Sequence, residues 1–98
     1  MFTVKQIPEF AVWLARIRDT VTRLRLARRL DKAGRGLLGD VKPVGEGVYE
    51  MREDFGPCWR MYFVQRGSTL IVMLGGGDKA AQKADIAKAI ELAANLED

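Results

Sequence analysis

Histidine is absent from the 98-residue chain, and cysteine occurs once, at Cys58. Because imidazole is the usual proton-transfer group near neutral pH, a catalytic acid or base here would be a lysine, a tyrosine or a carboxyl group with a shifted pKa. Serine and cysteine nucleophiles that depend on an imidazole are excluded, as are standard zinc clusters and an internal disulfide. We therefore expect no metal site and no cofactor.

Long hydrophobic runs are also missing. Each apolar segment is shorter than a bilayer span, and the N-terminus lacks the basic, apolar and small-residue succession of a secretory signal. With 48% hydrophobic residues, the chain can form one core of modest size but not two. We expect a single domain over residues 1–98, in a cytoplasmic protein that makes no contact with a membrane.

Positive charge is abundant, and it is unevenly distributed. The net charge is +3, and positions 16–35 hold eight basic residues against two acidic ones. Such a block favours a polyanion, either nucleic acid or an acidic partner protein, although a solvated helix face has the same pattern. The candidate RNA-binding residues are Arg23, Arg25, Arg28, Arg29 and Lys32.

The periodicity of the N-terminal part predicts a strand followed by a helical hairpin. Residues 2–6 have the β-branched and aromatic content of a strand, and Pro8 suits the first turn of a helix. That helix is expected to end near Arg18, and a second helix is expected from Asp19 or Thr20 to Gly34. The glycine-rich and proline-containing positions 37–47 are expected to form an exposed loop.

The C-terminal part predicts a sheet and a last helix, which makes the fold class α+β. Strands at 48–53, 59–65 and 69–74 are separated by short glycine-containing turns, as in an antiparallel meander. With the N-terminal strand, the sheet would have about four strands. Asp78 is a good N-cap for a C-terminal helix that would cover the free face of the sheet or the helical hairpin.

The hairpin predicted over positions 48–65 places two arginines near each other. Side chains two apart on a strand share a face, so Arg60 and Tyr62 lie together, with Arg52 and Glu50 beside them on the preceding strand. The opposite face carries the apolar side chains expected in the core: Tyr49, Met51, Trp59, Met61 and Phe63. Since like charges opposite one another are unfavourable, the arginine pair requires an anion such as phosphate. We expect both guanidinium groups to converge on an accessible hollow.

These residues suit phosphodiester transfer within RNA, because the substrate brings its own nucleophile, the 2′-hydroxyl. Arg52 and Arg60 can each grip two phosphate oxygens and stabilise the pentacovalent phosphate. In the alternative, the arginines form structural ion pairs with nearby carboxylates, at positions 50, 53 and 54. Tyr62 can stack on a base or help to move a proton, or it can be an ordinary amphipathic strand residue.

The glycine-rich segment at positions 75–79 ends in Asp78 and Lys79. It lacks the spaced glycine and the Lys-Ser/Thr pair of a Walker loop, so nucleotide triphosphate binding is not expected. A glycine-rich segment before a helix still exposes backbone N–H groups to an anion, and Lys79 adds positive charge there. A flexible turn between strand and helix is the alternative.

The order of the elements resembles the RelE/ParE superfamily of bacterial toxins, over nearly the whole chain. The resemblance is closest to the HigB-like group of addiction-module killer proteins. It rests on four blocks in the same order: GDVKPVGEGV at 39–48, EMREDFGP at 50–57, WRMYF at 59–63 and GGDK at 76–79.

This resemblance implies a RelE-like fold and the toxin component of a type II toxin-antitoxin module. Such a toxin is an endoribonuclease, or mRNA interferase, that cleaves messenger RNA on the translating ribosome without a metal. Besides messenger RNA and the ribosome, such a toxin binds a cognate antitoxin, which often carries a helix-turn-helix domain. The toxin contacts operator DNA only through this antitoxin. By correspondence, Arg52 and Arg60 would stabilise the phosphate, and Lys79 or Tyr62 would assist proton transfer.

A related branch of the superfamily inhibits DNA gyrase and has no nuclease activity. This chain lacks the histidines that some of the ribonucleases use, and it has no tyrosine near its C-terminus. A ParE-like gyrase inhibitor and a non-catalytic toxin that binds protein or nucleic acid are therefore alternatives to the ribonuclease.

Overall fold

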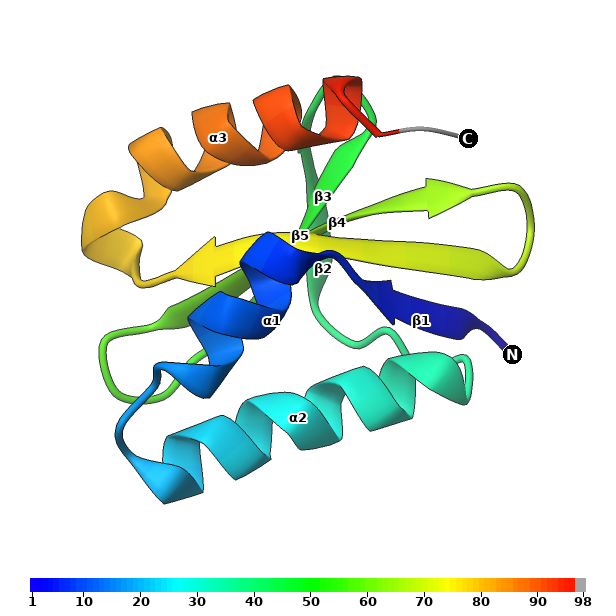
Figure 1. The fold of residues 1–98 in the computed structure, drawn as a ribbon. Coiled ribbons are helices and arrows are strands. Elements are labelled where there is room, and N and C mark those ends of the chain that lie inside the picture. Colours follow the sequence, from blue (N-terminus) through cyan, green and yellow to red (C-terminus); the bar gives the residue numbers. More distant parts are fainter. Residues whose placement is uncertain (97–98) are drawn as a thin grey trace.

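The structure, a computed structural model, describes residues 1–96 and has the expected α+β class (Figure 1). The elements run in the order β1 (Thr3–Gln6), α1 (Pro8–Ala15), α2 (Thr20–Gly34), β2 (Val41–Gly45), β3 (Val48–Glu53), β4 (Trp59–Arg66), β5 (Leu70–Gly77), the 3-10 turn η1 (Lys79–Ala81) and α3 (Gln82–Ala94). Asp19 caps α2, as the sequence predicted, and accepts a hydrogen bond from the Thr22 amide. Asp78, expected to cap the last helix, caps the 3-10 turn η1 by accepting a hydrogen bond from the Ala81 amide, whereas α3 begins after Ala81 without a side-chain cap.

The sheet corrects the expectation of about four antiparallel strands. Its five strands are ordered β1-β5-β4-β3-β2, and β1 is parallel to β5 whereas the other neighbours are antiparallel. The additional strand, β2, lies inside the segment expected to be a loop. Proline and glycine hid it in the sequence, because both are tolerated on an edge strand where the register is irregular, as it is between Pro43 and Gly45.

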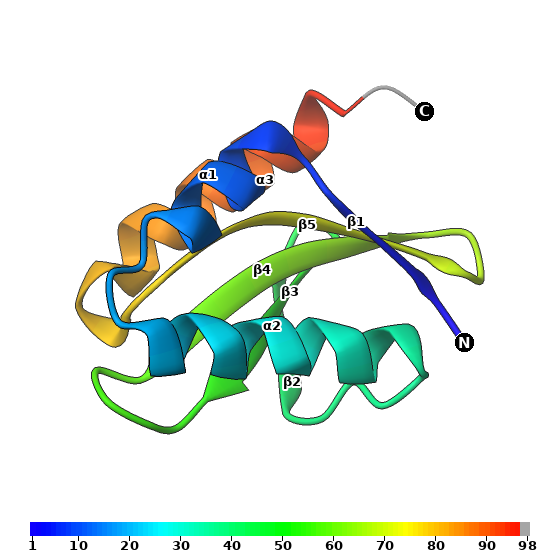
Figure 2. The same cartoon turned by 60° about the horizontal axis from the view of Figure 1, so that its bottom comes forward.

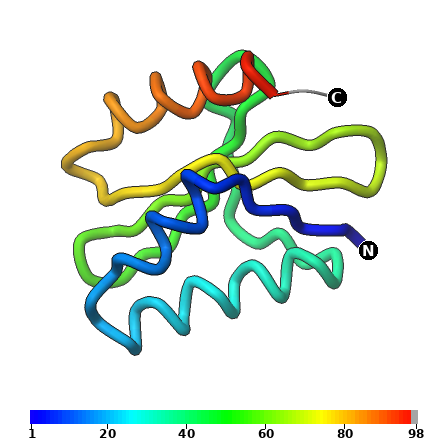
Figure 3. The backbone as a smooth tube through the Cα atoms, in the orientation of Figure 1, coloured from blue at the N-terminus to red at the C-terminus, as the bar shows by residue number. Residues whose placement is uncertain are grey.

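Helices cover both faces of the sheet, with α2 and α3 on opposite sides (Figure 2). Trp13 of α1 fills the space beside Gly76, and Asp85 of α3 fills the space beside Gly77. Because successive strand residues face opposite sides, α1 and α3 also lie on opposite faces of β5. The backbone trace shows the C-terminal helix returning across the sheet after β5 (Figure 3). The last helix therefore covers the sheet, one of the two expected positions.

The core lies in the middle of the sheet. Met61 to Val64 of β4 and Ile71 to Leu74 of β5 are buried on both faces, because these interior strands have helices on both sides of the sheet. Leu26, Leu30 and Ala33 of α2 pack into the same core. No helix within residues 1–96 is long and apolar enough to cross a membrane.

Candidate functional site

The register of β3 and β4 confirms the expected arginine pair. Arg52 lies directly opposite Arg60, and Glu50 lies opposite Tyr62. Since the two positions on each strand are two residues apart, all four side chains lie on one face of the sheet. We call these four residues, Glu50, Arg52, Arg60 and Tyr62, the Arg60 cluster.

The expectation that this face is open to solvent is wrong for most of the cluster. Glu50 and Tyr62 are 0% exposed and Arg60 is 6% exposed, whereas the Arg52 side chain retains 34% of its surface. Helix α3 covers the face: the Gln82 side chain donates a 2.8 Å hydrogen bond to Glu50. Strand periodicity separates the two faces of a sheet, but it does not say whether a later helix covers the polar one.

The buried polar atoms of the Arg60 cluster are poorly satisfied. Arg60 Nε lies 3.8 Å from Glu50 Oε2, which makes an ion pair without a hydrogen bond. Within residues 1–96, no hydrogen-bond partner exists for Arg60 Nε and Nη1, Glu50 Oε1 or the Tyr62 hydroxyl. Arg52 Nε is 3.3 Å from Asp40 Oδ2, also without hydrogen-bond geometry. Unpartnered buried groups cost free energy, so the cluster retains the capacity to bind an anion with unused N–H donors.

Two pKa shifts define the proton chemistry of this face. Burial, followed by the negative charge of Glu50, raises the pKa of the Tyr62 hydroxyl well above its usual range. The shift makes Tyr62 a weaker acid, so its hydroxyl stays protonated and would lose a proton only to a strongly basic oxygen. Burial, followed by the charge of Asp78, also raises the pKa of the Asp85 carboxyl group. Sequence reasoning missed Asp85, for which the only signal was a carboxylate in the first turns of the helix after the glycine-rich strand.

Lys79 lies at the same end of the sheet as the arginine pair. Its backbone amide donates a 3.3 Å hydrogen bond to the Pro57 carbonyl, which ties η1 to the loop between β3 and β4. Arg60 pairs with Gly77, two residues before Lys79. The fold thus places Arg52, Arg60 and Lys79 at one end of the sheet, with the Lys79 side chain exposed and the Arg60 side chain buried.

The basic residues of α2 separate into two groups. Arg29 is buried, and its guanidinium donates five hydrogen bonds, at 2.8 to 3.1 Å. The acceptors are the carbonyl oxygens of Leu38, Asp40 and Arg52 and the carboxylate of Glu53. Arg29 therefore connects α2 both to the loop that precedes β2 and to strand β3. Its hydrogen-bond donors are already used within the fold.

The remaining predicted RNA-binding residues lie nearer the surface. Arg23 is half-buried and donates a 2.7 Å hydrogen bond to the Ile17 carbonyl. Arg25, Arg28 and Lys32 are exposed and line a groove of about 590 Å³. The Arg25 guanidinium stacks 4.0 Å above the ring of Phe55.

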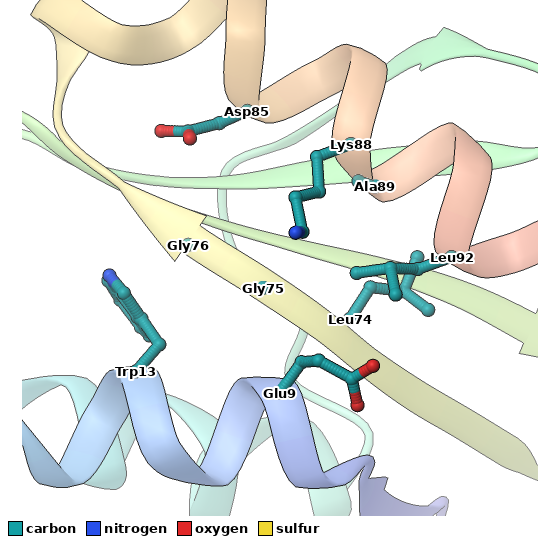
Figure 4. A pocket seen from close by; sticks show the side chains of 9 residues that line it. All are labelled: Glu9, Trp13, Leu74, Gly75, Gly76, Asp85, Lys88, Ala89 and Leu92. Atoms are coloured by element: carbon teal, nitrogen blue, oxygen red, sulfur yellow. The ribbon is translucent and has the colours of Figure 1, made fainter.

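A second, smaller cleft of about 190 Å³ lies between α1 and α3, beside Leu74, Gly75 and Gly76 of β5. Trp13 and Glu9 line it from α1, and Asp85 and Lys88 line it from α3 (Figure 4). Asp85 lines this cleft and also lies against Gly77, the residue that pairs with Arg60. Across residues 1–96, no group of three or more His, Cys, Asp or Glu side chains is placed to hold a metal ion.

Among known proteins, the chain is similar to an uncharacterized protein of Haemophilus influenzae (strain Rd). The two are 32% identical over 93 residues, which cover 95% of this chain and 94% of the relative. The chain belongs to the same family as that protein. No protein-family model and no solved structure matches it.

Proposed function

We propose that this chain, as a member of the family that includes the Haemophilus influenzae protein, is the toxin component of a type II toxin-antitoxin module. It would be a RelE/ParE-like, HigB-like endoribonuclease that cleaves messenger RNA on the translating ribosome in the cytoplasm, without a metal. The observation that carries this proposal is the Arg60 cluster, where two guanidinium groups on adjacent strands have N–H donors without hydrogen-bond partners.

A phosphate bound between Arg52 and Arg60 would relieve the repulsion between their like charges. Opposed like charges destabilise a sheet, and a phosphodiester placed between them can accept hydrogen bonds from both. Charge builds up on the phosphate oxygens as the 2′-oxygen attacks, so donors preorganised at Arg52 and Arg60 would stabilise the transition state more than the ground state.

The proton steps can be assigned to neighbouring groups. As the bond between the 2′-oxygen and phosphorus forms, the 2′-hydroxyl proton passes to a base, for which the unpartnered Glu50 Oε1 is the available carboxylate oxygen. As the bond between phosphorus and the 5′-oxygen breaks, that oxygen develops alkoxide charge and takes a proton from the Tyr62 hydroxyl, which is protonated at neutral pH but is a weakened acid. Lys79 would contribute positive charge beside the scissile phosphate.

Access to the cluster requires the start of α3 to move. The buried side chains of α3 are only Ala89 and Ala93, both in its second half. The first half of the helix is held by the hydrogen bond from Gln82 to Glu50 and by Ile86, which is partly buried and packs against the core. Displacing η1 and the first turn of α3 would expose Arg60 and Tyr62 to RNA.

The test is to induce the chain in bacteria and map transcript 5′ ends. Arg60→Ala should abolish both growth arrest and cleavage, while Arg35→Ala, which removes an exposed arginine with a surface ion pair, should retain both. Circular dichroism of each purified variant checks the fold. Cleavage by a folded Arg60→Ala variant would refute the assignment.

The burial of Arg60 and Tyr62 favours a second candidate, a toxin that acts by binding a protein such as DNA gyrase, or that binds nucleic acid without cleaving it. Gyrase inhibition would produce DNA damage with intact transcripts after induction. In both cases we propose a cognate antitoxin, with a helix-turn-helix domain that provides the contact with operator DNA. A neighbouring gene for such a protein would support either toxin.

A further inference from the structure

One stripe of α2 is exposed to solvent along its whole length. Val21, Leu24, Arg25, Arg28 and Lys32 recur at intervals that place them on one side of a helix. Val21 is 72% exposed and Leu24 is 56% exposed. All five side chains line the groove of about 590 Å³, with Arg29 and Glu53 beside them. We call these five residues the α2 stripe.

The stripe combines two chemistries. Its N-terminal end is aliphatic and the rest is basic. Within residues 1–96, no carboxylate pairs with Arg25, Arg28 or Lys32, because Asp31 pairs with Arg35 and Glu53 pairs with Arg29. The positive charge of the stripe is therefore uncompensated.

The aliphatic end indicates which kind of polyanion would bind. RNA bases stack on aromatic rings or on guanidinium planes, and phosphates need only positive charge, so Val21 and Leu24 would be left without a role. The ring of Phe55 already has the Arg25 guanidinium 4.0 Å above it. A helix that carries both leucine-type side chains and carboxylates would use the entire stripe.

We infer that the α2 stripe is the docking surface for an acidic amphipathic helix of a partner protein. Apolar side chains of that helix bury Val21 and Leu24, and its carboxylates pair with Arg25, Arg28 and Lys32. That the partner is an antitoxin rests on the proposed function, whereas the surface and the chemistry of its occupant rest on α2 alone.

The experiment titrates the full-length ¹⁵N-labelled chain with a synthetic acidic amphipathic helical peptide that has leucines at i, i+3, i+4 and i+7. Shift changes are expected in α2 and around Glu53 and Phe55, with affinity that falls as salt rises. Leu24→Asp should weaken binding by about tenfold or more, while Leu37→Asp, at another exposed leucine, should not. Arg28→Glu should weaken it similarly, and Lys83→Glu on α3 is the control for the same change of charge.

Poly-uridylic acid is titrated in parallel, and sedimentation of the free chain tests self-association. The inference is overturned by absence of peptide binding, by tighter RNA binding that survives Leu24→Asp, or by dimerisation through α2. Transcript cleavage is measured separately. Cleavage without peptide binding removes this inference alone, and peptide binding without cleavage removes the ribonuclease alone.

Discussion

Arg29 and Arg60 are buried to nearly the same extent, 8% and 6% exposed, in opposite hydrogen-bonding environments. Arg29 makes five hydrogen bonds to three carbonyl oxygens and a carboxylate. Arg60 has one ion pair at 3.8 Å and two nitrogens without a hydrogen bond. Burial alone therefore does not distinguish an arginine whose donors are all used within the fold from one with unused donors, whereas the hydrogen-bond partners do.

The largest stability loss is expected for Arg29→Ala. Removing this buried guanidinium leaves three carbonyl groups and the Glu53 carboxylate without their donor, so we expect a loss of about 3–5 kcal/mol in the free energy of unfolding. Urea denaturation monitored by circular dichroism measures it. Arg35→Ala should change stability by less than about 0.5 kcal/mol, and equal losses for the two variants would contradict the structural role of Arg29.

Replacing Glu50 and Arg60 together should change the free energy of unfolding far less than Arg29→Ala does. The double variant Glu50→Leu with Arg60→Met removes an unsatisfied ion pair and puts apolar side chains in its place, so we expect stability within about 1 kcal/mol of the unmodified chain, or higher. Under the ribonuclease proposal, growth arrest should be lost. The same denaturation series measures the stability, and a loss as large as that of Arg29→Ala would erase the distinction between the two arginines.

Gln82→Ala tests whether α3, which covers the Arg60 cluster, is held less firmly at its start than α2 is. Loss of the hydrogen bond to Glu50 should cost about 1 kcal/mol and raise amide exchange at the start of α3, with little change in α2. Under the ribonuclease proposal, cleavage by the variant should be faster. Gln65→Ala, which removes an exposed hydrogen bond at the β4–β5 turn, is the matched control. Identical amide exchange in both variants would show that Gln82 does not hold the start of α3 in place.

The smallest effect is expected from Asp85, through pH. Because the folded pKa of Asp85 is raised above its usual value of 3.8, its contribution to stability is present below that value and is lost as pH rises through the folded pKa. Asp85→Asn removes this dependence, so the variant should gain stability relative to the unmodified chain at neutral pH and lose that gain in acid. Urea denaturation at several pH values provides the comparison. A gain that grows in acid would reverse the assigned shift.

Local signals were sufficient for much of the fold. Strand β3 begins at Val48 and ends at Glu53, as expected, and α2 ends at Gly34, as its glycine indicated. The register of Arg52 with Arg60 followed from the position of the turn between their strands. A place for the N-terminal strand beside strand β5 or at the edge of the sheet was expected, and β1 pairs with β5. The parallel direction of this pairing did not follow from the sequence, because partners so distant along the chain leave no local pattern.

Side-chain chemistry and periodicity determined by themselves that this chain folds as α+β, without histidine chemistry, and that two arginines face each other across neighbouring strands. Only the tertiary structure decided that α3 covers that pair. It also decided that the Arg29 donors form hydrogen bonds within the fold, while Arg25, Arg28 and Lys32 remain exposed. The physical reason is range. Helix caps, turns and strand alternation act over a few residues, whereas burial and donor satisfaction depend on segments that meet only after the chain has folded.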